Sequence, residues 1–421
     1  MDLAWLSFHN AGSRFLVSVG CPPGPWPFGA RVVKGSFELI SCLERSLPFF
    51  PEGQFAKIAI QLAKELGGGK GERMQILQRQ TVRAKMLQVM EYLRRALEEF
   101  DPRLLKRSKL VEVEGTSLLD NTAANLELLR NFKAQPDDLL ICTYPKAGTT
   151  WVQEIVDMVQ HGGDKQKCAR APIYERIPFI DLFPMKPISS GLEMAEAMPS
   201  PRTLKSHLPV QLLPPSFWEQ NCKLPKLNQE CISLAGKFWE LKSRHLQVDK
   251  IIYVARNIKD TIVSYFHFHR MNQAMPKPGN WDQFLENFLT GQIAWGSWFE
   301  HVRGWWEAKE HHPILYLFYE DIKEDPTREI QKIAHFLNFE LPDPLLKEIV
   351  EHTKFETMKS NPMANYLTLP AFVMNQSLSP FMRKGIVGNW KEHFTVAQNE
   401  KIDEITSQLL ADSGLVFRTE L

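Results

Sequence analysis

Lys146 is the residue from which a reactive site can first be predicted. It stands in the loop Tyr-Pro-Lys-Ala-Gly-Thr-Thr-Trp at 144–151, between an apolar run at 139–143 and a stretch with helical apolar spacing at 151–159. Pro145 cannot donate to a strand ladder, so the apolar run ends there. A strand, a tight loop and a helix N-terminus favour phosphate, because backbone N–H groups and the helix dipole both attract an anion. An ordinary strand-to-helix turn that contains a lysine would show the same pattern.

Two further segments carry groups that suit a second phosphate. Arg256 follows an apolar, strand-like run, and Ser264 lies in the helical stretch behind it. An arginine fork and a serine hydroxyl both donate hydrogen bonds to phosphate oxygens. In the other segment, Arg383 and Lys384 precede Gly385, which permits close approach of the backbone to an anion. Either segment alone is more typical of a structural ion pair or a solvated turn.

His207 supplies a candidate for proton transfer. It ends the triplet Lys-Ser-His at 205–207, where a predicted strand stops. An imidazole with a pKa near ~6.5 can accept a proton at neutral pH, whereas a phenol with a pKa near ~10 stays mostly protonated. A lone histidine at a strand end is more often a packed or surface residue, so this role is a hypothesis.

These residues require a scaffold of strands that alternate with helices. The predicted strands are 110–115, 139–143, 204–209, 250–257 and 314–321. The predicted helices are 123–132, 151–159, 259–269, 326–337 and 343–352. This alternation, which begins near residue 107, predicts a single α/β domain with a parallel sheet and helices on both faces.

The loop at 144–151 resembles the 5′-phosphosulfate loop of the cytosolic sulfotransferases. Residues 253–265 and 381–391 resemble the 3′-phosphate segments of the same family, and the three motifs occur in the family's order. The resemblance extends over about 109–421 and is best with the phenol (aryl) branch, including its 1C-like members. It implies a P-loop-like α/β fold, 3′-phosphoadenosine-5′-phosphosulfate (PAPS) as co-substrate, and no metal.

The resemblance also implies roles for individual residues. Lys146, Lys205, His207 and Ser264 form the implied catalytic set, with His207 as general base. Trp151 is expected to stack on adenine. The implied donor-binding residues are Lys146, Ala147, Gly148, Thr149, Thr150, Trp151, Arg256, Ser264, Tyr319, Thr353, Phe355, Phe381, Met382, Arg383, Lys384 and Gly385. The implied acceptor-binding residues, several of which could equally be core residues, are Tyr174, Phe179, Lys205, His207, Phe268, Tyr366, Val373 and Met374.

The sequence departs from the family pattern in three short places and two long ones. Ser206 replaces a threonine, Lys354 replaces a serine, and Asn389 stands where the family usually has aspartate. Residues 1–106 are expected to form an atypical extension, partly helical or disordered, with a helical pattern at 72–100. Residues 107–421 are expected to form the sulfotransferase domain, interrupted by an unusual insertion at 224–249.

Composition limits the remaining classes of function. The chain has 421 residues and a formal net charge of +1, which argues against a general nucleic-acid or membrane-surface role. No apolar run reaches the ~18 residues of a membrane span. The 6 cysteines show no zinc-ligand spacing and suggest reduced thiols. We therefore expect a cytoplasmic enzyme of xenobiotic metabolism, and the family's dimer segment, matched by Lys391–Glu400, implies a homodimer.

The expected reaction transfers a sulfuryl group from PAPS to the hydroxyl, or amine, of a small phenolic acceptor. The products would be a sulfate ester and adenosine 3′,5′-bisphosphate (PAP). Two alternatives remain at this stage. One is a catalytically impaired isoform, which the insertion at 224–249 favours. The other is a small-molecule kinase, against which the loop argues because its lysine precedes the glycine, unlike the G-x-x-x-x-G-K-[ST] motif.

Overall fold

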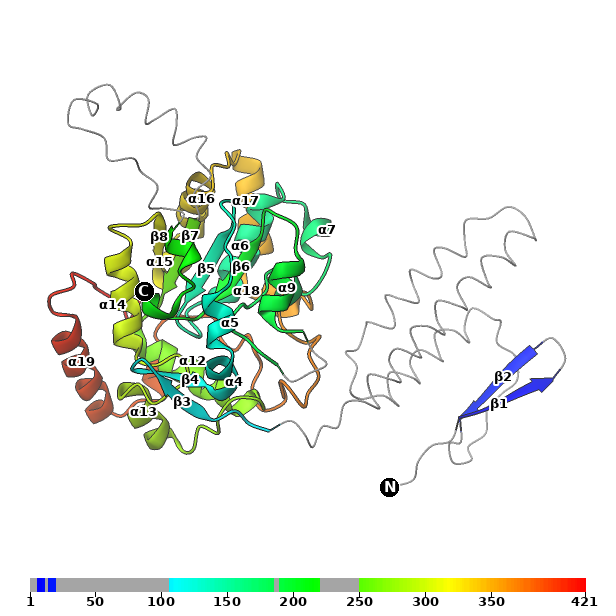
Figure 1. The fold of residues 1–421 in the computed structure, drawn as a ribbon, viewed down its shortest axis with the longest axis horizontal. Coiled ribbons are helices and arrows are strands. Elements are labelled where there is room, and N and C mark those ends of the chain that lie inside the picture. The colour runs from blue at the N-terminus through cyan, green and yellow to red at the C-terminus, as the bar shows by residue number, and fades with distance from the viewer. Residues whose placement is uncertain (1–5, 12–13, 20–105, 185–188, 220–249) are drawn as a thin grey trace. The chain divides into compact units, whose positions relative to one another are not determined.

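The computed structural model describes residues 6–11, 14–19, 106–184, 189–219 and 250–421 (Figure 1). The predicted helical pattern at 72–100 and the predicted insertion at 224–249 lie outside these residues. Near the N-terminus, β1 (Leu6–Ala11) and β2 (Arg14–Val19) pair in an antiparallel hairpin. The expected character of residues 1–106, partly helical or disordered, stays a prediction.

A four-stranded parallel sheet forms the centre of the domain (Figure 1). Its strands, in spatial order, are β6 (Thr203–Ser206), β5 (Leu139–Thr143), β7 (Lys250–Ala255) and β8 (Ile314–Phe318). All three pairings are parallel, which confirms the predicted sheet type. A separate antiparallel pair consists of β3 (Leu110–Val113) and β4 (Thr116–Leu119).

Two hydrophobic cores cover the two faces of this sheet. Ile252 and Val254 of β7 belong to one core, together with residues of α6 (Thr149–Gln160), α16 (Pro326–Phe336) and α17 (Asp343–His352). Ile251 and Tyr253 belong to the other, with residues of α13 (Trp281–Leu289) and α14 (Trp298–Ala308). Successive strand residues point to opposite faces, so this apolar run is buried on both sides, as predicted.

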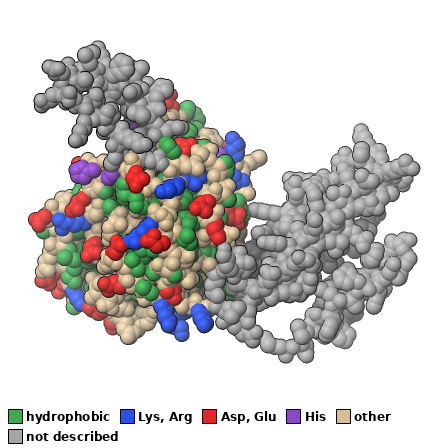
Figure 2. All heavy atoms as spheres, in the orientation of Figure 1, with side chains coloured by type: hydrophobic (Ala, Val, Ile, Leu, Met, Phe, Trp, Pro, Cys, Tyr) green, Lys and Arg blue, Asp and Glu red, His purple; other side chains and the backbone are tan. Residues whose placement is uncertain are grey.

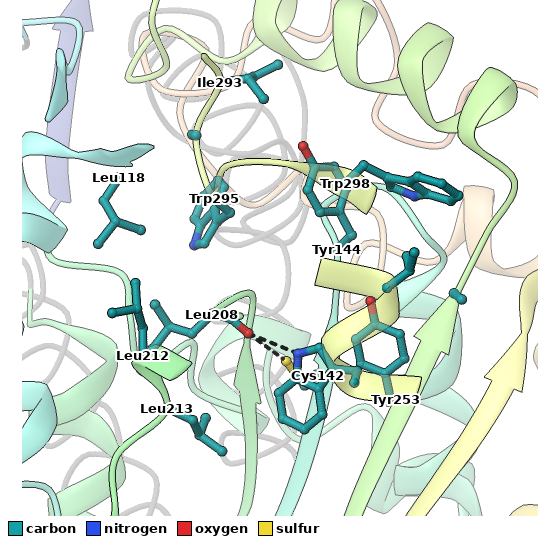
Figure 3. Packing of buried hydrophobic residues seen from close by; sticks show 14 of the residues in the cluster. Leu118, Cys142, Tyr144, Leu208, Leu212, Leu213, Tyr253, Ile293, Trp295 and Trp298 are labelled. Carbon is teal, nitrogen blue, oxygen red and sulfur yellow. Dashed lines mark hydrogen bonds between the residues drawn. The ribbon is translucent and has the colours of Figure 1, made fainter. Parts of the chain in front are cut away.

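The second core contains the buried residues around Cys142 of β5 and Leu208 (Figure 3). There the carbonyl of Leu208 accepts hydrogen bonds from Cys142 Sγ at 3.5 Å and from Trp305 Nε1 at 3.2 Å. Tyr253 Oη, also buried, lies 2.8 Å from His301 Nδ1. These polar contacts inside an apolar region fix the backbone just beyond the triplet 205–207, because unpaired buried donors are costly.

The remaining α-helices of the described residues are α4 (Asp120–Ala124), α5 (Leu126–Arg130), α7 (Lys165–Cys168), α8 (Ile173–Arg176), α9 (Gly191–Ala197), α10 (Ser216–Glu219), α12 (Ile258–Met271), α15 (Tyr319–Glu324), α18 (Phe355–Ser360) and α19 (Val396–Leu410). One predicted helix and one predicted strand differ from the structure. The predicted helix 123–132 is interrupted at Asn125, whose φ of −110° and ψ of 15° are not helical. The predicted strand 314–321 ends at Phe318, because Glu320 and Asp321 favour the first turn of a helix.

The surface agrees with the nearly neutral composition. On the face drawn in Figure 2, acidic and basic side chains are interspersed over the described residues. Within the described part of the chain, none of the helices combines the length and apolar character that a membrane crossing requires.

Candidate active site

The loop between β5 and α6 places Lys146 in an unusual backbone conformation. The φ angle is 69° at Lys146 and 102° at Gly148. A Cβ atom added to Gly148 would lie 2.7 Å from Tyr319 Cδ2, so only glycine fits against this ring. A left-handed lysine is uncommon, and strained backbone conformations of this kind cluster at functional sites.

Lys146 lies between two aromatic rings in a cationic environment. Its Nζ is 4.2 Å from the ring centre of Phe381 and 4.5 Å from that of Phe268. Burial, assisted by the charges of Lys205, Arg256 and Arg383, lowers the pKa of Lys146 to about 7. Several cations held together at this depth are electrostatically unfavourable unless an anion joins them.

Arg256 connects the loop between β5 and α6 to the segment that contains Ile386. Its Nη1 donates to the carbonyl of Lys146 at 3.3 Å, and its Nη2 donates to the carbonyl of Ile386 at 3.1 Å. The guanidinium lies 4.3 Å from the ring centre of Tyr319. Among the described residues, the Nε atoms of Arg256 and Arg383 have no hydrogen-bond partner although both are buried. Such donors fit the oxygens of a phosphate group, which they could bind without breaking an existing bond.

Aromatic rings line the adjoining part of the site. The rings of Trp151 and Tyr319 meet edge to face, with centres 5.5 Å apart. Phe355 packs against Gly385 so closely that an added Cβ would lie 2.1 Å from Phe355 Cδ2. Flat apolar surfaces beside phosphate-binding cations suit a nucleotide, so these residues fit the group that the sequence implies.

His207 is held in the tautomer that a general base requires. Its Nδ1 lies 2.7 Å from the carbonyl oxygen of Thr143, which can only accept, so Nδ1 carries the proton. Nε2 is then the unprotonated nitrogen. Burial, followed by the charge of Lys205, lowers the pKa of His207 well below its usual value. The imidazole is therefore neutral at physiological pH and able to accept a proton.

Lys205 is the second lysine of the site. It precedes His207 by two residues, and its Nζ lies 4.0 Å from the ring centre of Phe179. Burial lowers the pKa of Lys205 to about 8, and the nearby carboxylate of Asp181 opposes that shift. A lysine in this state still carries its charge for most of the time at neutral pH.

A single cavity of about 360 Å³ brings these groups together. It is lined by all the predicted donor-binding residues except Ala147, and by the predicted acceptor-binding residues Phe179, Lys205, His207, Phe268, Tyr366, Val373 and Met374. Ala147 is instead fully buried. Tyr174 is behind the lining: its hydroxyl lies 2.9 Å from Thr368 Oγ1, and its ring centre is 5.7 Å from that of Tyr366.

Several lining residues were not predicted. Trp295 has its ring centre 5.2 Å from that of His207, and Lys323 lines the same cavity. Asp181 lies beside His207 without lining the cavity. The sequence around Trp295 shows only an aromatic residue next to Gly296, which does not indicate a site. The sequence around Asp181 does not distinguish this buried carboxylate from an acidic residue on the surface.

A second cluster of polar residues resembles a metal site in composition only. Within the described residues, ligand atoms of Asp157, His161 and Cys168 lie within 4.8 Å of one another. Asp157 already accepts from Arg170 Nη2 at 3.0 Å and from Arg176 Nη1. A cation would have to displace both guanidinium groups, so we interpret the cluster as a structural ion-pair network.

The chain belongs to the sulfotransferase family. Residues 136–224 and 240–414 match the family profile described as the sulfotransferase domain. It is 51% identical over 316 residues to sulfotransferase 1C2 of Homo sapiens, and also to that of Oryctolagus cuniculus, covering 75% of this chain and 97% of each relative. It is 48% identical over 315 residues to sulfotransferase 1A1 of Rattus norvegicus, covering 75% and 99%. These relatives assign it to family 1 of the cytosolic sulfotransferases, a group of PAPS-dependent enzymes.

Solved structures agree with this assignment. Mouse sulfotransferase SULT7A1, solved in complex with PAP, has a TM-score of 0.54 and 30% identity, covering 72% of this chain and 96% of that chain. Retinol dehydratase, solved with androsterone and PAP, has a TM-score of 0.61 at 23% identity, covering 74% and 92%, and supports the fold.

Proposed function

We propose that this chain transfers the sulfuryl group of PAPS to the hydroxyl of a small phenolic acceptor, with aromatic amines as a second acceptor class. The products are a sulfate ester and PAP. The observation that carries the proposal is the placement of a neutral histidine, His207, in the same cavity as a cluster of anion-binding cations.

The donor end of the cavity binds two separated anionic groups. Arg256, Ser264, Arg383 and Lys384 would hold the 3′-phosphate, for which the two buried Nε atoms provide support. Lys146 and the first turn of α6 would hold the phosphosulfate. PAPS, when bound there, supplies an activated sulfuryl group and a nucleotide leaving group. Fixed cations around the leaving oxygen stabilise charge that develops during transfer.

The acceptor end binds a phenol and removes its proton. Nε2 of His207 accepts the hydroxyl proton, while the bond from Nδ1 to Thr143 keeps the ring in position. Lys205 lowers the cost of negative charge on the sulfuryl oxygens. Phe179, Phe268 and other apolar residues of the lining suit a flat aromatic acceptor better than a polar one.

Assembly and location complete the proposal. We place the enzyme in the cytoplasm, in xenobiotic metabolism, as a homodimer formed through Lys391–Glu400. Thr395 and Gln398 form a capping box at the start of α19, and Val396 beside them is 74% exposed, which suits a contact surface.

We further propose that residues 1–106 are an extension of the sulfotransferase domain at 107–421, and that 224–249 is an insertion. The family profile leaves 225–239 unmatched, which supports an insertion in this region. The alternative is a catalytically impaired isoform, which the insertion favours. The intact set of Lys146, His207, Arg256 and Ser264 favours activity.

Ligand selectivity tests the proposal most directly. Calorimetry should show that PAP binds far more tightly than AMP, because only PAP offers a 3′-phosphate to Arg256 and Arg383. Labelled PAPS should sulfate 4-nitrophenol faster than cyclohexanol, a non-aromatic control of similar size. Equal affinity for AMP and PAP would overturn the donor assignment, and a preference for cyclohexanol would overturn the phenolic acceptor.

A further inference from the structure

Asp181 is a buried carboxylate at the acceptor end of the cavity that the mechanism above does not use. It follows a short extended segment in which Phe179 pairs with Lys205 in parallel. Ile180 N donates to the carbonyl of Lys205 at 3.0 Å, and Lys205 N donates to the carbonyl of Pro178 at 2.8 Å. The segment thus extends the sheet beyond β6 and brings Asp181 next to the strand end that carries the base.

The carboxylate accepts hydrogen bonds from two parts of the acceptor site. The backbone N of His207 lies 3.3 Å from each of its oxygens, and Trp295 Nε1 donates to Oδ2 at 2.8 Å. Asp181 has no exposed surface. A buried acceptor of this kind fixes its donors, because any donor left unpaired loses its solvation without compensation.

Trp295 is held in a conformation that it would not adopt by itself. Its φ angle is 67°, in the left-handed region that bulky side chains avoid. The ring lies edge-on to His207, with centres 5.2 Å apart, and stacks with Phe179 at 5.8 Å. Such outliers persist where surrounding contacts impose them, and they cluster at functional sites. The hydrogen bond to Asp181 is one of those contacts, so the carboxylate also sets the position of the Trp295 ring in the lining of the cavity.

Besides its hydrogen bonds to His207 and Trp295, the carboxylate of Asp181 affects the protonation of Lys205 through its charge. Burial raises the pKa of Asp181 to about 6, so it is ionised at neutral pH. The titratable groups that face it are Lys205 on β6, His207 directly after β6, and Cys142 on β5. Its negative charge is the influence that raises the pKa of Lys205 against the effect of burial. Without it, less of Lys205 would be protonated at neutral pH.

We propose that Asp181 is a positioning residue for sulfuryl transfer. One carboxylate fixes His207 through its peptide N–H, fixes the Trp295 side of the acceptor cavity, and provides the counter-charge of Lys205. The inference rests on the proposed role of His207 as the base and names a residue that acts through it.

Two substitutions at Asp181 test this role. Asp181→Asn keeps the shape of the side chain but removes its charge, whereas Asp181→Glu keeps the charge. With PAPS and 4-methylphenol, whose pKa near ~10 keeps its own ionisation outside the pH range tested, kcat of Asp181→Asn should fall roughly 10- to 100-fold, as expected for a displaced catalytic group, while PAP affinity stays within about twofold. The alkaline limb of kcat/KM for the phenol should move to lower pH in Asp181→Asn, because Lys205 loses its counter-charge, and should return toward the wild-type position in Asp181→Glu.

The outcomes separate this inference from the proposed function. Wild-type kcat and an unmoved alkaline limb in Asp181→Asn would overturn the inference. A parallel loss of PAP affinity would also overturn it, by showing that Asp181 supports the whole domain. If the wild-type protein does not sulfate a phenol, the proposed acceptor is wrong. The indole N–H resonance of Trp295, assigned with Trp295→Phe, then decides: it should move in Asp181→Asn, because its hydrogen-bond acceptor loses its charge, and an unmoved resonance would refute the contact with Asp181.

Discussion

The low pKa of Lys146 predicts that nucleotide binding is coupled to proton uptake. With a pKa of about 7, half of the Lys146 side chains are neutral at pH 7 and most are neutral at pH 8. A bound phosphate returns the pKa toward its ordinary value of ~10.5, so binding must add the missing proton. The dissociation constant for PAP should therefore rise roughly fivefold between pH 7 and pH 8, or ~1 kcal/mol. Lys205, with a pKa of about 8, should add a smaller, roughly twofold dependence.

Calorimetry in two buffers of different ionisation enthalpy measures both the affinity and the protons taken up. Wild-type protein should take up roughly 1.4 protons per PAP at pH 8, about 0.9 on Lys146 and about 0.5 on Lys205, and roughly 0.6 in total at pH 7. Lys146→Gln should bind PAP more weakly at pH 7 and should retain only the smaller dependence due to Lys205. An affinity for the wild type that is constant from pH 7 to 8.5, without proton uptake, would refute the reasoning, because Lys146 would then be charged before the nucleotide binds.

Three further predictions concern the base, the donor site and the insertion. His207→Ala should lower turnover of a phenol by ~10²–10⁴-fold while PAP binding is kept, and steady-state kinetics near wild type would show that His207 is not the base. Gly385→Ala should weaken PAP binding by about 1–3 kcal/mol, because the new Cβ would meet Phe355; Gly414→Ala, with a similar φ and open space, is the control for backbone strain alone. Deletion of 224–249 should raise both the melting temperature and the turnover, since its apolar residues have no assigned place in the family's core. A deleted form that melts lower and is no faster would show that the segment belongs to the fold.

The sequence was sufficient for the donor end of the site because that end is built from regular elements. Strand, loop and helix follow one another directly around Lys146, and the helix after Arg256 begins where the apolar pattern changes period. These elements begin and end within a residue or two of the predicted limits, apart from β8, which ends at Phe318 because Glu320 and Asp321 favour the first turn of α15.

The acceptor end was less predictable because its residues come from irregular segments far apart in the chain. Trp295 lies in the connection between α13 and α14, and its position depends on a left-handed backbone that no periodic pattern reveals. Tyr174 fits an aromatic lining by residue type, yet its hydroxyl is directed to Thr368. Residue type alone cannot distinguish a ring that faces a cavity from one that supports it.

The hydrogen bond between His207 and Thr143 has a consequence for how this enzyme can change. The peptide carbonyl that selects the protonated nitrogen of the base is also the last strand position before the loop of Lys146, so one peptide unit serves both substrates. A substitution that shifts this unit alters nucleotide affinity and proton abstraction together, and neither can be adjusted independently at that point. Variation in acceptor preference is therefore expected to accumulate at other residues of the lining, such as Leu369 and Val373, which come from a different segment of the chain and do not include the shared carbonyl.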